Sequence, residues 1–334
     1  MTNHQTCKLS NEIFSFDKDK EIKKIADRMR NILSSKLHRR GFVIAMSGGI
    51  DSSVSAALSV EAVGKKKVFG ILLPERDSSS ESTKRAKILA EYLGIDYYIQ
   101  DIAPTLDAIG CYSWRDEAIK NIFSEYNEKW KCKIAIKGNI EGKLNHFLLY
   151  VQSPDGHIYK ERLRLKEYLQ IVAATNYKQR VRKTIEYFHA DRLNYAVVGT
   201  PNRLEYDQGF FVKNGDGSAD IKPIAHLYKN QVFEVAKHLG LPNEVCSAEP
   251  TTDTYSMKQG QDEFYFSLPY KQMDVALWAY NHKIPVKELA EYLNINEIIA
   301  EGIYADIEAK QRTTIYQHAK PILIEPVNEI ISLC

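Results

Sequence analysis

The sequence predicts an α/β protein with a doubly wound parallel sheet, a small antiparallel insertion and a helical C-terminal part. Short apolar runs with the length of buried strands alternate with amphipathic, helix-like segments. A glycine- and serine-rich string follows the first run, as at a strand-to-helix turn. Strands that alternate with helices form parallel sheets, because each crossover helix returns the chain to the same end of the sheet. The predicted parallel strands are 42–46, 68–73, 97–99 and 195–199.

The helices between these strands follow from apolar spacing and capping residues. Residues 18–38 carry apolar side chains three and four positions apart, which is the period of one helix face. A second helix is predicted at 54–63, directly after the glycine-rich string. A third is predicted at about 81–93, with N-cap candidates among the serines of 78–82.

A long gap separates the third and fourth strands. Several segments in it alternate apolar and polar residues, and the turn sequence Ser153-Pro154-Asp155-Gly156 joins two of them. We therefore expect an antiparallel insertion of two or three strands within residues 111–165. The predicted elements are a helix near 115–130, strands at 131–137, 146–152 and 157–163, and a helix from about 165 to 192, with or without a break.

The C-terminal part, residues 225–334, is predicted to be helical, and residues 1–334 together are predicted to form a single domain. The polar loop 250–262 has the length and composition of a disordered segment or an active-site lid. Helices are predicted near 228–239, 269–282, 285–293 and 295–310.

Composition and charge exclude several classes of function. The formal net charge of +2 over 334 residues gives no general reason to expect nucleic-acid binding. No run of 18 apolar residues occurs, so we expect no membrane span. The polar N-terminus does not resemble a signal peptide. The five cysteines are scattered, without a CxxC pair, which indicates reduced thiols in the cytoplasm and no structural zinc site.

The string Ser47-Gly48-Gly49-Ile50-Asp51-Ser52-Ser53 carries most of the functional information. Backbone N–H groups at a glycine turn before a helix attract anions, and the helix dipole adds to that attraction. The glycines let the backbone approach a phosphate closely, the hydroxyls add donors, and Asp51 is a candidate magnesium ligand. An ordinary capped turn is the alternative interpretation. The string is neither a Walker A loop nor a GxGxxG fingerprint.

This string resembles the pyrophosphate loop of the ATP pyrophosphatases, which cleave ATP to AMP and pyrophosphate. The resemblance implies a Rossmann-like fold of the adenine-nucleotide α-hydrolase type. It does not by itself choose among NAD synthetases, GMP synthetases, argininosuccinate synthetases and tRNA-thiolating enzymes.

A second group of polar residues follows the fourth strand. Thr200 and Glu205 are predicted at the carboxyl edge of the sheet, near Asp51, where open α/β sheets bind ligands. Two carboxylates beside a phosphate site suit magnesium. The loop 209–220 then presents several charged residues, which on composition alone would be ordinary turn residues. On composition alone, a solvated face is also the simplest interpretation of the basic residues on the preceding helix: Lys178, Arg180, Arg182, Lys183 and Arg192.

The order of these motifs is similar to that in the ammonia-dependent NAD synthetases. The similarity extends over most of residues 18–275 and is interrupted by the insertion. It is most specific between Gly199 and Asp220. The motifs are SGGIDSS, NYKQRVR, GTPNRLE, GFFVKNGDGSADIKP, LYKNQV and EPTTD.

The resemblance implies an enzyme that amidates deamido-NAD with ATP and ammonia through an adenylylated carboxylate, with Mg²⁺ as cofactor. It implies a homodimer with shared sites and catalytic roles for Asp51, Asp216 and Lys229, with Asp216 near the incoming ammonia. The implied ATP ligands are Ser47, Gly48, Gly49, Asp51, Ser52, Ser53, Thr200, Lys229 and Thr251, and the implied metal ligands are Asp51 and Glu205. The implied dinucleotide ligands are Asn176, Arg180, Tyr187, Phe210, Lys213 and Asp220.

Three features depart from the family pattern. The insertion precedes the dinucleotide-binding helix, where it can cover the site, change the dimer contact or admit a different carboxylate. Pro201 replaces a small or polar residue, and His318 and Lys320 only loosely match the family's C-terminal His-Lys-Arg signature. No glutaminase domain is expected, so free ammonia or a separate glutaminase is the expected nitrogen source. The alternatives are an amide ligase for another carboxylate, a tRNA-modifying enzyme and a non-catalytic nucleotide-binding regulator.

Overall fold

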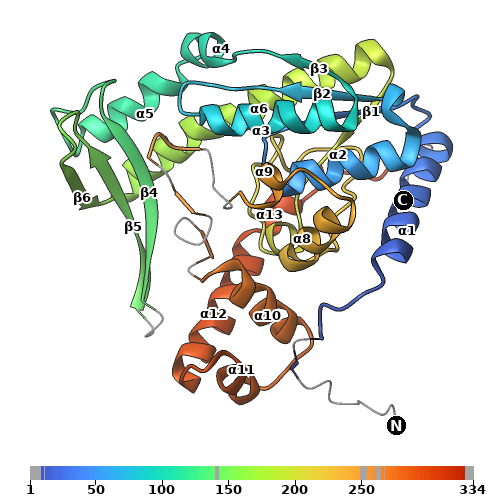
Figure 1. Ribbon diagram of the computed structural model, residues 1–334. Coiled ribbons are helices and arrows are strands. Elements are labelled where there is room, and N and C mark those ends of the chain that lie inside the picture. Colours follow the sequence, from blue (N-terminus) through green and yellow to red (C-terminus); the bar gives the residue numbers. More distant parts are fainter. Residues whose placement is uncertain are drawn as a thin grey trace.

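The four predicted strands form one parallel sheet in the order β3-β2-β1-β7, of which β1, β2 and β3 are labelled in Figure 1. The computed structural model describes residues 9–10, 12–139, 143–248, 254–257, 259–260, 265–266 and 268–327. The central strand β1 pairs with β2 on one side and with β7 on the other, so the chain crosses over between the third and fourth strands. The strands are β1 (Phe42–Ala45), β2 (Val68–Leu72), β3 (Asp96–Ile99) and β7 (Ala196–Val198).

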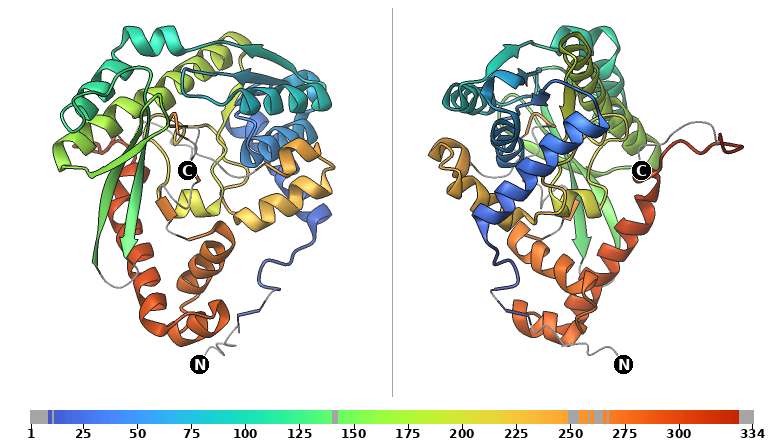
Figure 2. Two further views of the ribbon diagram at one scale, coloured as in Figure 1. Left: turned by 60° about the vertical axis from the view of Figure 1, so that its left-hand side comes forward. Right: turned by 90° about the vertical axis from the view of Figure 1, so that its right-hand side faces the viewer.

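Helices cover both faces of this sheet, as expected for a doubly wound fold (Figures 1 and 2). Alternate residues of β1 point to opposite faces, because the side-chain period of a strand is two. Phe42 and Ile44 are buried in the core with α1, α2, α3 and α8, while Val43 is buried in the core with α6 (Leu165–Leu193). The helices of the first group are α1 (Lys18–Asn31, continued by a π-helix at Ile32–Lys36), α2 (Ile50–Val63), α3 (Ser80–Leu93) and α8 (Lys229–His238).

The insertion forms the predicted antiparallel sheet, in the order β4-β5-β6 (Figure 1). The predicted helix at 115–130 is wrong in its bounds: α5 begins at Cys111 and ends at Lys120, and turns continue from there to Trp130. The inward face of the sheet packs on α5 and α6 in a core of its own. The elements of this region are α4 (Ala103–Ala108), α5 (Cys111–Lys120), β4 (Lys131–Asn139), β5 (Lys143–Gln152) and β6 (Ile158–Arg162).

The long helix α6 (Leu165–Leu193) runs without a break from the insertion to the last strand of the parallel sheet. The interpretation of its basic residues as a solvated face is wrong for two of them, because Lys178 and Lys183 are buried in ion pairs with acidic residues. The helix ends where Asn194 adopts a left-handed conformation with φ 55°.

The C-terminal part is helical, as predicted. The helices beyond β7 include three short ones that the sequence did not predict, α7, α9 and α13. The predicted loop at 250–262 lies partly outside the described residues. The helices are α7 (Arg203–Asp207), α9 (Asn243–Cys246), α10 (Tyr270–Asn281), α11 (Val286–Leu293), α12 (Glu297–Thr313) and α13 (Ile315–His318). Among the helices of the described ranges, none is long and apolar enough to cross a membrane.

Candidate active site

A cavity of about 740 Å³ opens at the carboxyl edge of the parallel sheet. Residues that follow β1, β2 and β7 line it, which is the place where open α/β sheets bind ligands. The insertion and the C-terminal part also contribute to its wall, through residues such as Phe147, Tyr265 and Tyr316. The cavity therefore joins three regions that are far apart in the sequence.

The glycine-rich loop forms a tight turn from β1 into α2. Gly48 has φ 76°, and an added Cβ would collide with the carbonyl oxygen of Ser82 in α3, so only glycine fits this position. The hydroxyls of Ser52 and Ser53 donate to the carbonyl of Gly49 at 2.9 and 2.8 Å. Ser47, Gly49, Asp51 and Ser52 line the cavity. Ser53 is buried behind them.

One asparagine connects the two predicted metal ligands. The side-chain amide of Asn202 donates to Oδ1 of Asp51 at 3.1 Å. Asn202 also caps α7: its Oδ1 accepts from the backbone N–H of Glu205 at 3.1 Å, and its own backbone N–H donates to Oε2 of Glu205 at 3.2 Å. The sequence analysis did not name Asn202, although the spacing of Asn202 and Glu205 is that of a capping box.

Lys229 lies in the same wall, at the start of α8, and forms an ion pair with Oδ2 of Asp51. Burial alone would lower the pKa of Lys229, but the negative charges of Asp51 and Glu205 outweigh it and raise the pKa. Lys229 is therefore a permanent cation at the carboxyl edge of the sheet. Behind it, Asp274 accepts from the backbone N–H groups of Lys229 and Asn230 at 3.3 and 2.8 Å, and burial raises the pKa of Asp274 to about 7.

The donor set of this wall fits magnesium bound to a nucleotide. Asp51 and Glu205 both line the cavity. Across the described ranges, no group of three or more His, Cys, Asp or Glu side chains could hold a metal without further ligands. Mg²⁺ commonly uses one or two carboxylates together with substrate phosphates and water, so two carboxylates beside a phosphate loop are sufficient.

A second group of charges lies around Asp216. Its carboxylate accepts from the backbone N–H of Val212 at 2.7 Å, and burial raises its pKa. Nearby, Lys183 pairs with Glu186 at 2.8 Å, and burial raises the pKa of Glu186 as well. All three charged side chains line the cavity. The sequence analysis had no signal for Glu186, because its burial depends on how α6 packs.

The predicted dinucleotide ligands fall into two sets. Asn176, Arg180, Phe210 and Lys213 line the cavity, as does the predicted ATP ligand Thr200. Tyr187 and Asp220 do not: the Tyr187 hydroxyl donates to Asp220 at 3.3 Å, and Tyr187 lines an adjoining open depression of about 480 Å³, which shares Lys183 and Asn214 with the cavity. Thr251 lies outside the described residues.

The C-terminal candidates lie at the margin of the site. His318 packs edge-on against the rings of Tyr206 and Phe211, with ring centroids 5.0 Å apart in each pair, and burial lowers its pKa. Lys320 is exposed. Their neighbour Tyr316 does line the cavity, and its backbone carbonyl accepts from Nζ of Lys213 at 2.9 Å.

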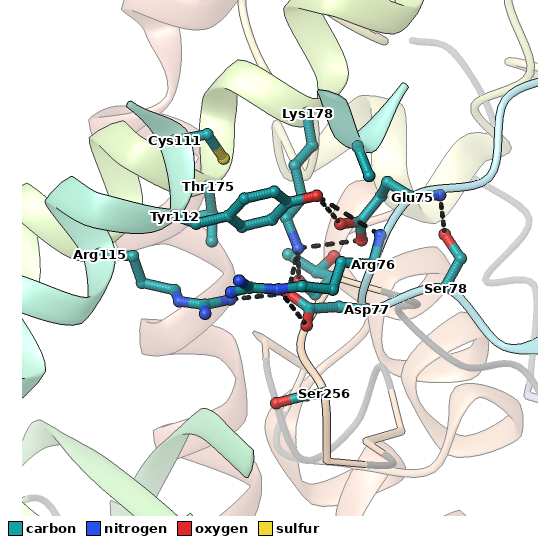
Figure 3. Close-up of polar contacts among 12 residues, drawn as sticks. Glu75, Arg76, Asp77, Ser78, Cys111, Tyr112, Arg115, Thr175, Lys178 and Ser256 are labelled. Atoms are coloured by element: carbon teal, nitrogen blue, oxygen red, sulfur yellow. Dashed lines mark hydrogen bonds and ion pairs between the residues drawn. The ribbon is translucent and has the colours of Figure 1, made fainter. Parts of the chain in front are cut away.

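A buried ionic cluster supports the wall from behind (Figure 3). Nζ of Lys178 donates to Glu75 at 3.0 Å, to Asp77 at 2.7 Å and to the backbone carbonyl of Thr254 at 2.8 Å. Arg115 of α5 contacts the same Asp77 at 2.7 Å. The cluster thus ties the segment after β2, the insertion, α6 and residues 254–257 together.

Known proteins resemble this chain over most of its length. A sequence model of the NAD synthase family, described as "NAD synthase", matches residues 21–154 and 153–314. An "NH(3)-dependent NAD(+) synthetase" of Rhizobium meliloti (strain 1021) is 51% identical over 322 residues, covering 96% of each chain. One of the same name from Thermotoga maritima is 37% identical over 240 residues, covering 70% of this chain and 78% of the relative.

Solved structures of the same fold cover nearly the whole chain. An NH3-dependent NAD synthetase from Campylobacter jejuni matches with a TM-score of 0.61 and 21% identity, covering 93% of this chain and 100% of the other. An NMN synthetase from Francisella tularensis matches equally well, with a TM-score of 0.61 and 21% identity, covering 92% and 99%. At this identity the two structures support the fold alone.

Proposed function

The chain belongs to the NAD synthase family, and we propose that its cavity catalyses the ATP-dependent amidation of deamido-NAD to NAD with ammonia. The products besides NAD are AMP and pyrophosphate. The observation that carries this proposal is the arrangement of Asp51, Glu205 and Lys229 beside the glycine-rich loop in one cavity. Relatives named NH(3)-dependent NAD(+) synthetases match this chain over nearly its full length. These similarities favour the synthetase over a tRNA-modifying enzyme or a non-catalytic regulator.

In the first step, an oxygen of the nicotinate carboxylate attacks the α-phosphorus of ATP, and the bond to the β-phosphate oxygen breaks. Pyrophosphate leaves with the electron pair of that bond. Ser47, Ser52 and the backbone of the glycine-rich loop bind the departing pyrophosphate, and Lys229 offsets its charge. Mg²⁺ bound by Asp51 and Glu205 would supply Lewis-acid stabilisation of the phosphates.

In the second step, ammonia attacks the carbonyl carbon of the acyl adenylate, and AMP leaves with the electrons of the acyl–oxygen bond. The attacking nitrogen must lose a proton. Asp216 lines the cavity, and its raised pKa suits a group that accepts that proton or orients ammonium before attack. Asn176, Arg180, Phe210 and Lys213 would hold the dinucleotide on the same wall.

Mass spectrometry tests the reaction directly. The protein is incubated with ATP, ammonium, magnesium chloride and deamido-NAD, and NAD, AMP and pyrophosphate are expected in equal amounts. Omitting ammonium should leave pyrophosphate formation but no NAD. A panel of other carboxylates serves as the comparison, and amidation of one of these in preference to deamido-NAD would contradict the proposed substrate.

The two carboxylates are tested by isotope exchange between ATP and pyrophosphate in the presence of deamido-NAD. Asp51→Ala and Glu205→Ala are each expected to abolish the exchange, because each removes one of the ligands proposed for the metal. The exposed carboxylate Glu161 on β6 offers a matched control, since Glu161→Ala removes the same charge away from the cavity. Near-normal exchange in either cavity variant would overturn the assigned metal roles.

The remaining expectations concern assembly and location. We propose a homodimer, because apolar side chains of α5 and α6 are exposed in the single chain: Trp114, Leu165, Leu169 and Phe188. Sedimentation equilibrium tests this, and a monomer at micromolar concentration would contradict it.

We also propose that residues 1–334 form a single cytoplasmic domain. Free ammonia or a separate glutaminase would supply the nitrogen for the reaction. The three cysteines within the described ranges are free thiols, which is consistent with a reducing compartment.

A further inference from the structure

We propose that the inserted sheet gives the cavity a ring-binding subsite, made by Phe147, Tyr168 and Tyr255, for an aromatic base of the dinucleotide substrate. The inference rests on the proposed function and assigns to the insertion a part of substrate binding. Phe147 comes from β5, Tyr168 from the first turns of α6, and Tyr255 from the segment beside β4. All three line the cavity.

Phe147 and Tyr168 already form a stacked pair. Their ring centroids are 4.0 Å apart and the planes differ by 21°. Phe147 belongs to the inward row of β5, in which Leu149 and Val151 are fully buried in the core of the insertion. Phe147 continues that row, packs against the same core while only partly buried, and also lines the cavity. The sheet therefore holds an aromatic ring rigidly at the cavity wall.

Tyr255 is placed by the edge of β4. The backbone N–H of Cys132 donates to the Ser256 hydroxyl at 2.9 Å, and the backbone N–H of Met257 donates to the Cys132 carbonyl at 3.2 Å. Lys178 holds the carbonyl of Thr254 from the other side, at 2.8 Å. Tyr255 lies between these anchors and is buried. The insertion therefore positions Tyr255 in addition to Phe147.

The subsite lies on the dinucleotide wall of the cavity. Tyr168, Val172, Asn176 and Arg180 are spaced four residues apart along α6, so they share one face of the helix, and all four line the cavity. Asn176 and Arg180 are the polar residues proposed to hold the dinucleotide. Met46 and Leu73, which directly follow β1 and β2, line the cavity from the parallel sheet and not from α6. The stacked pair is thus in line with the dinucleotide ligands, which favours the dinucleotide over the adenine of ATP.

The chemistry of the subsite suits a flat ring. Aromatic side chains stack on nucleobases and pyridine rings through their faces, and such contacts tolerate different bases because each has a π-face. Tyr265 and Phe210, which stack on each other with centroids 4.7 Å apart, also line the cavity. A ribose or a phosphate would gain little from such surroundings.

The experiment compares Phe147→Ala with the wild type under saturating ammonium and magnesium. We expect KM for deamido-NAD to rise about tenfold, the size of one lost base–aromatic stack, while KM for ATP stays within about twofold. Calorimetric titration of deamido-NAD without ATP should show the same loss of affinity. An unchanged KM for deamido-NAD, or a rise confined to KM for ATP, would overturn the proposal.

Two further variants separate ring contact from packing. Phe147→Leu keeps apolar volume but removes the ring, so it should weaken deamido-NAD binding nearly as much as Phe147→Ala while keeping the melting temperature closer to wild type. Tyr159→Ala is the matched control, because Tyr159 of β6 stacks on Trp130, just before β4, with centroids 5.9 Å apart, and does not line the cavity. An equal rise in KM in Tyr159→Ala would show general loosening and contradict the proposal. If the wild type makes no NAD at all, the proposed function fails; a normal wild type with an unaffected Phe147→Leu defeats only the subsite.

Discussion

Two buried lysines, in different regions of the molecule, illustrate how the same side chain serves two purposes. Lys178 on α6 is enclosed by Glu75, Asp77 and the carbonyl of Thr254, so each of its three N–H groups has an acceptor. Lys229 on α8 is equally buried but lines the cavity, paired with Asp51. The first lysine joins segments of the fold, and the second presents a positive charge to the cavity. Burial of a charge therefore does not by itself identify a functional residue; the surface that the charge faces does.

The largest expected effect separates the two lysines by activity. Lys229→Met should lower kcat by about 10²–10³-fold, because it removes a preorganised charge beside the leaving pyrophosphate. The melting temperature should change little, since Asp51 keeps the hydrogen bond from Asn202 and lies at the cavity surface. Steady-state NAD formation and a thermal melt measure both. A variant that is active but unstable would reverse the assigned roles.

The next largest expected effect separates the two lysines by their contribution to the free energy of unfolding. Lys178→Met leaves Glu75 and Asp77 buried without their shared cation, and breaking such a pair costs about 3–5 kcal/mol. Urea unfolding followed by circular dichroism should show this loss. Lys237, an exposed lysine on α8 that pairs with Glu234, is the matched control, and Lys237→Met should change the free energy of unfolding by less than about 1 kcal/mol. Equal effects at the two positions would contradict the comparison.

A smaller effect concerns how the stability of the fold changes at acidic pH. Burial raises the pKa of Asp77, but Lys178 and Arg115 outweigh it and hold the pKa below its ordinary value. The ionised carboxylate of Asp77 therefore stabilises the fold at neutral pH, and this contribution is lost as the pH falls through the lowered pKa. Asp77→Asn should lower the melting temperature at pH 7, through a loss of about 1–3 kcal/mol, and the gap to wild type should shrink toward pH 3. A gap that is independent of pH would show that the charge is not responsible.

The smallest effect has the opposite sign and belongs to the region of Lys229. Burial raises the folded-state pKa of Asp274 to about 7, so its contribution is complete below the ordinary aspartate pKa and is lost as the pH rises toward neutrality. Asp274→Asn cannot ionise, so wild type should lose stability relative to this variant as the pH rises from about 4 to about 7. Melting temperatures over this range measure the trend. A trend of the same sign as for Asp77 would refute the raised pKa.

The site residues that local motifs predicted are those whose role depends on their immediate neighbours in the chain. The turn at Gly48 and the helix that follows it each depend on a few consecutive residues, and the structure contains both. The ends of the predicted strands also placed Asp51, Thr200 and Glu205 at one edge of the sheet, and the family resemblance added Lys229 as an ATP ligand. All four line the cavity. The bounds of α5 were not predictable in the same way, because the turns that end it at Lys120 depend on packing in the insertion.

The sequence by itself determined the strands, the phosphate loop and the family, because apolar period, glycine placement and motif order are properties of neighbouring residues. Only the tertiary structure decided that Asn202 bridges Asp51 and Glu205, that Lys178 is enclosed while Arg180 faces the cavity, and that Phe147 lines it. These outcomes depend on how α6, the insertion and residues 254–257 pack against the sheet. A side chain's charge or ring is encoded locally, but its solvation and its partners are set by segments far away in the chain.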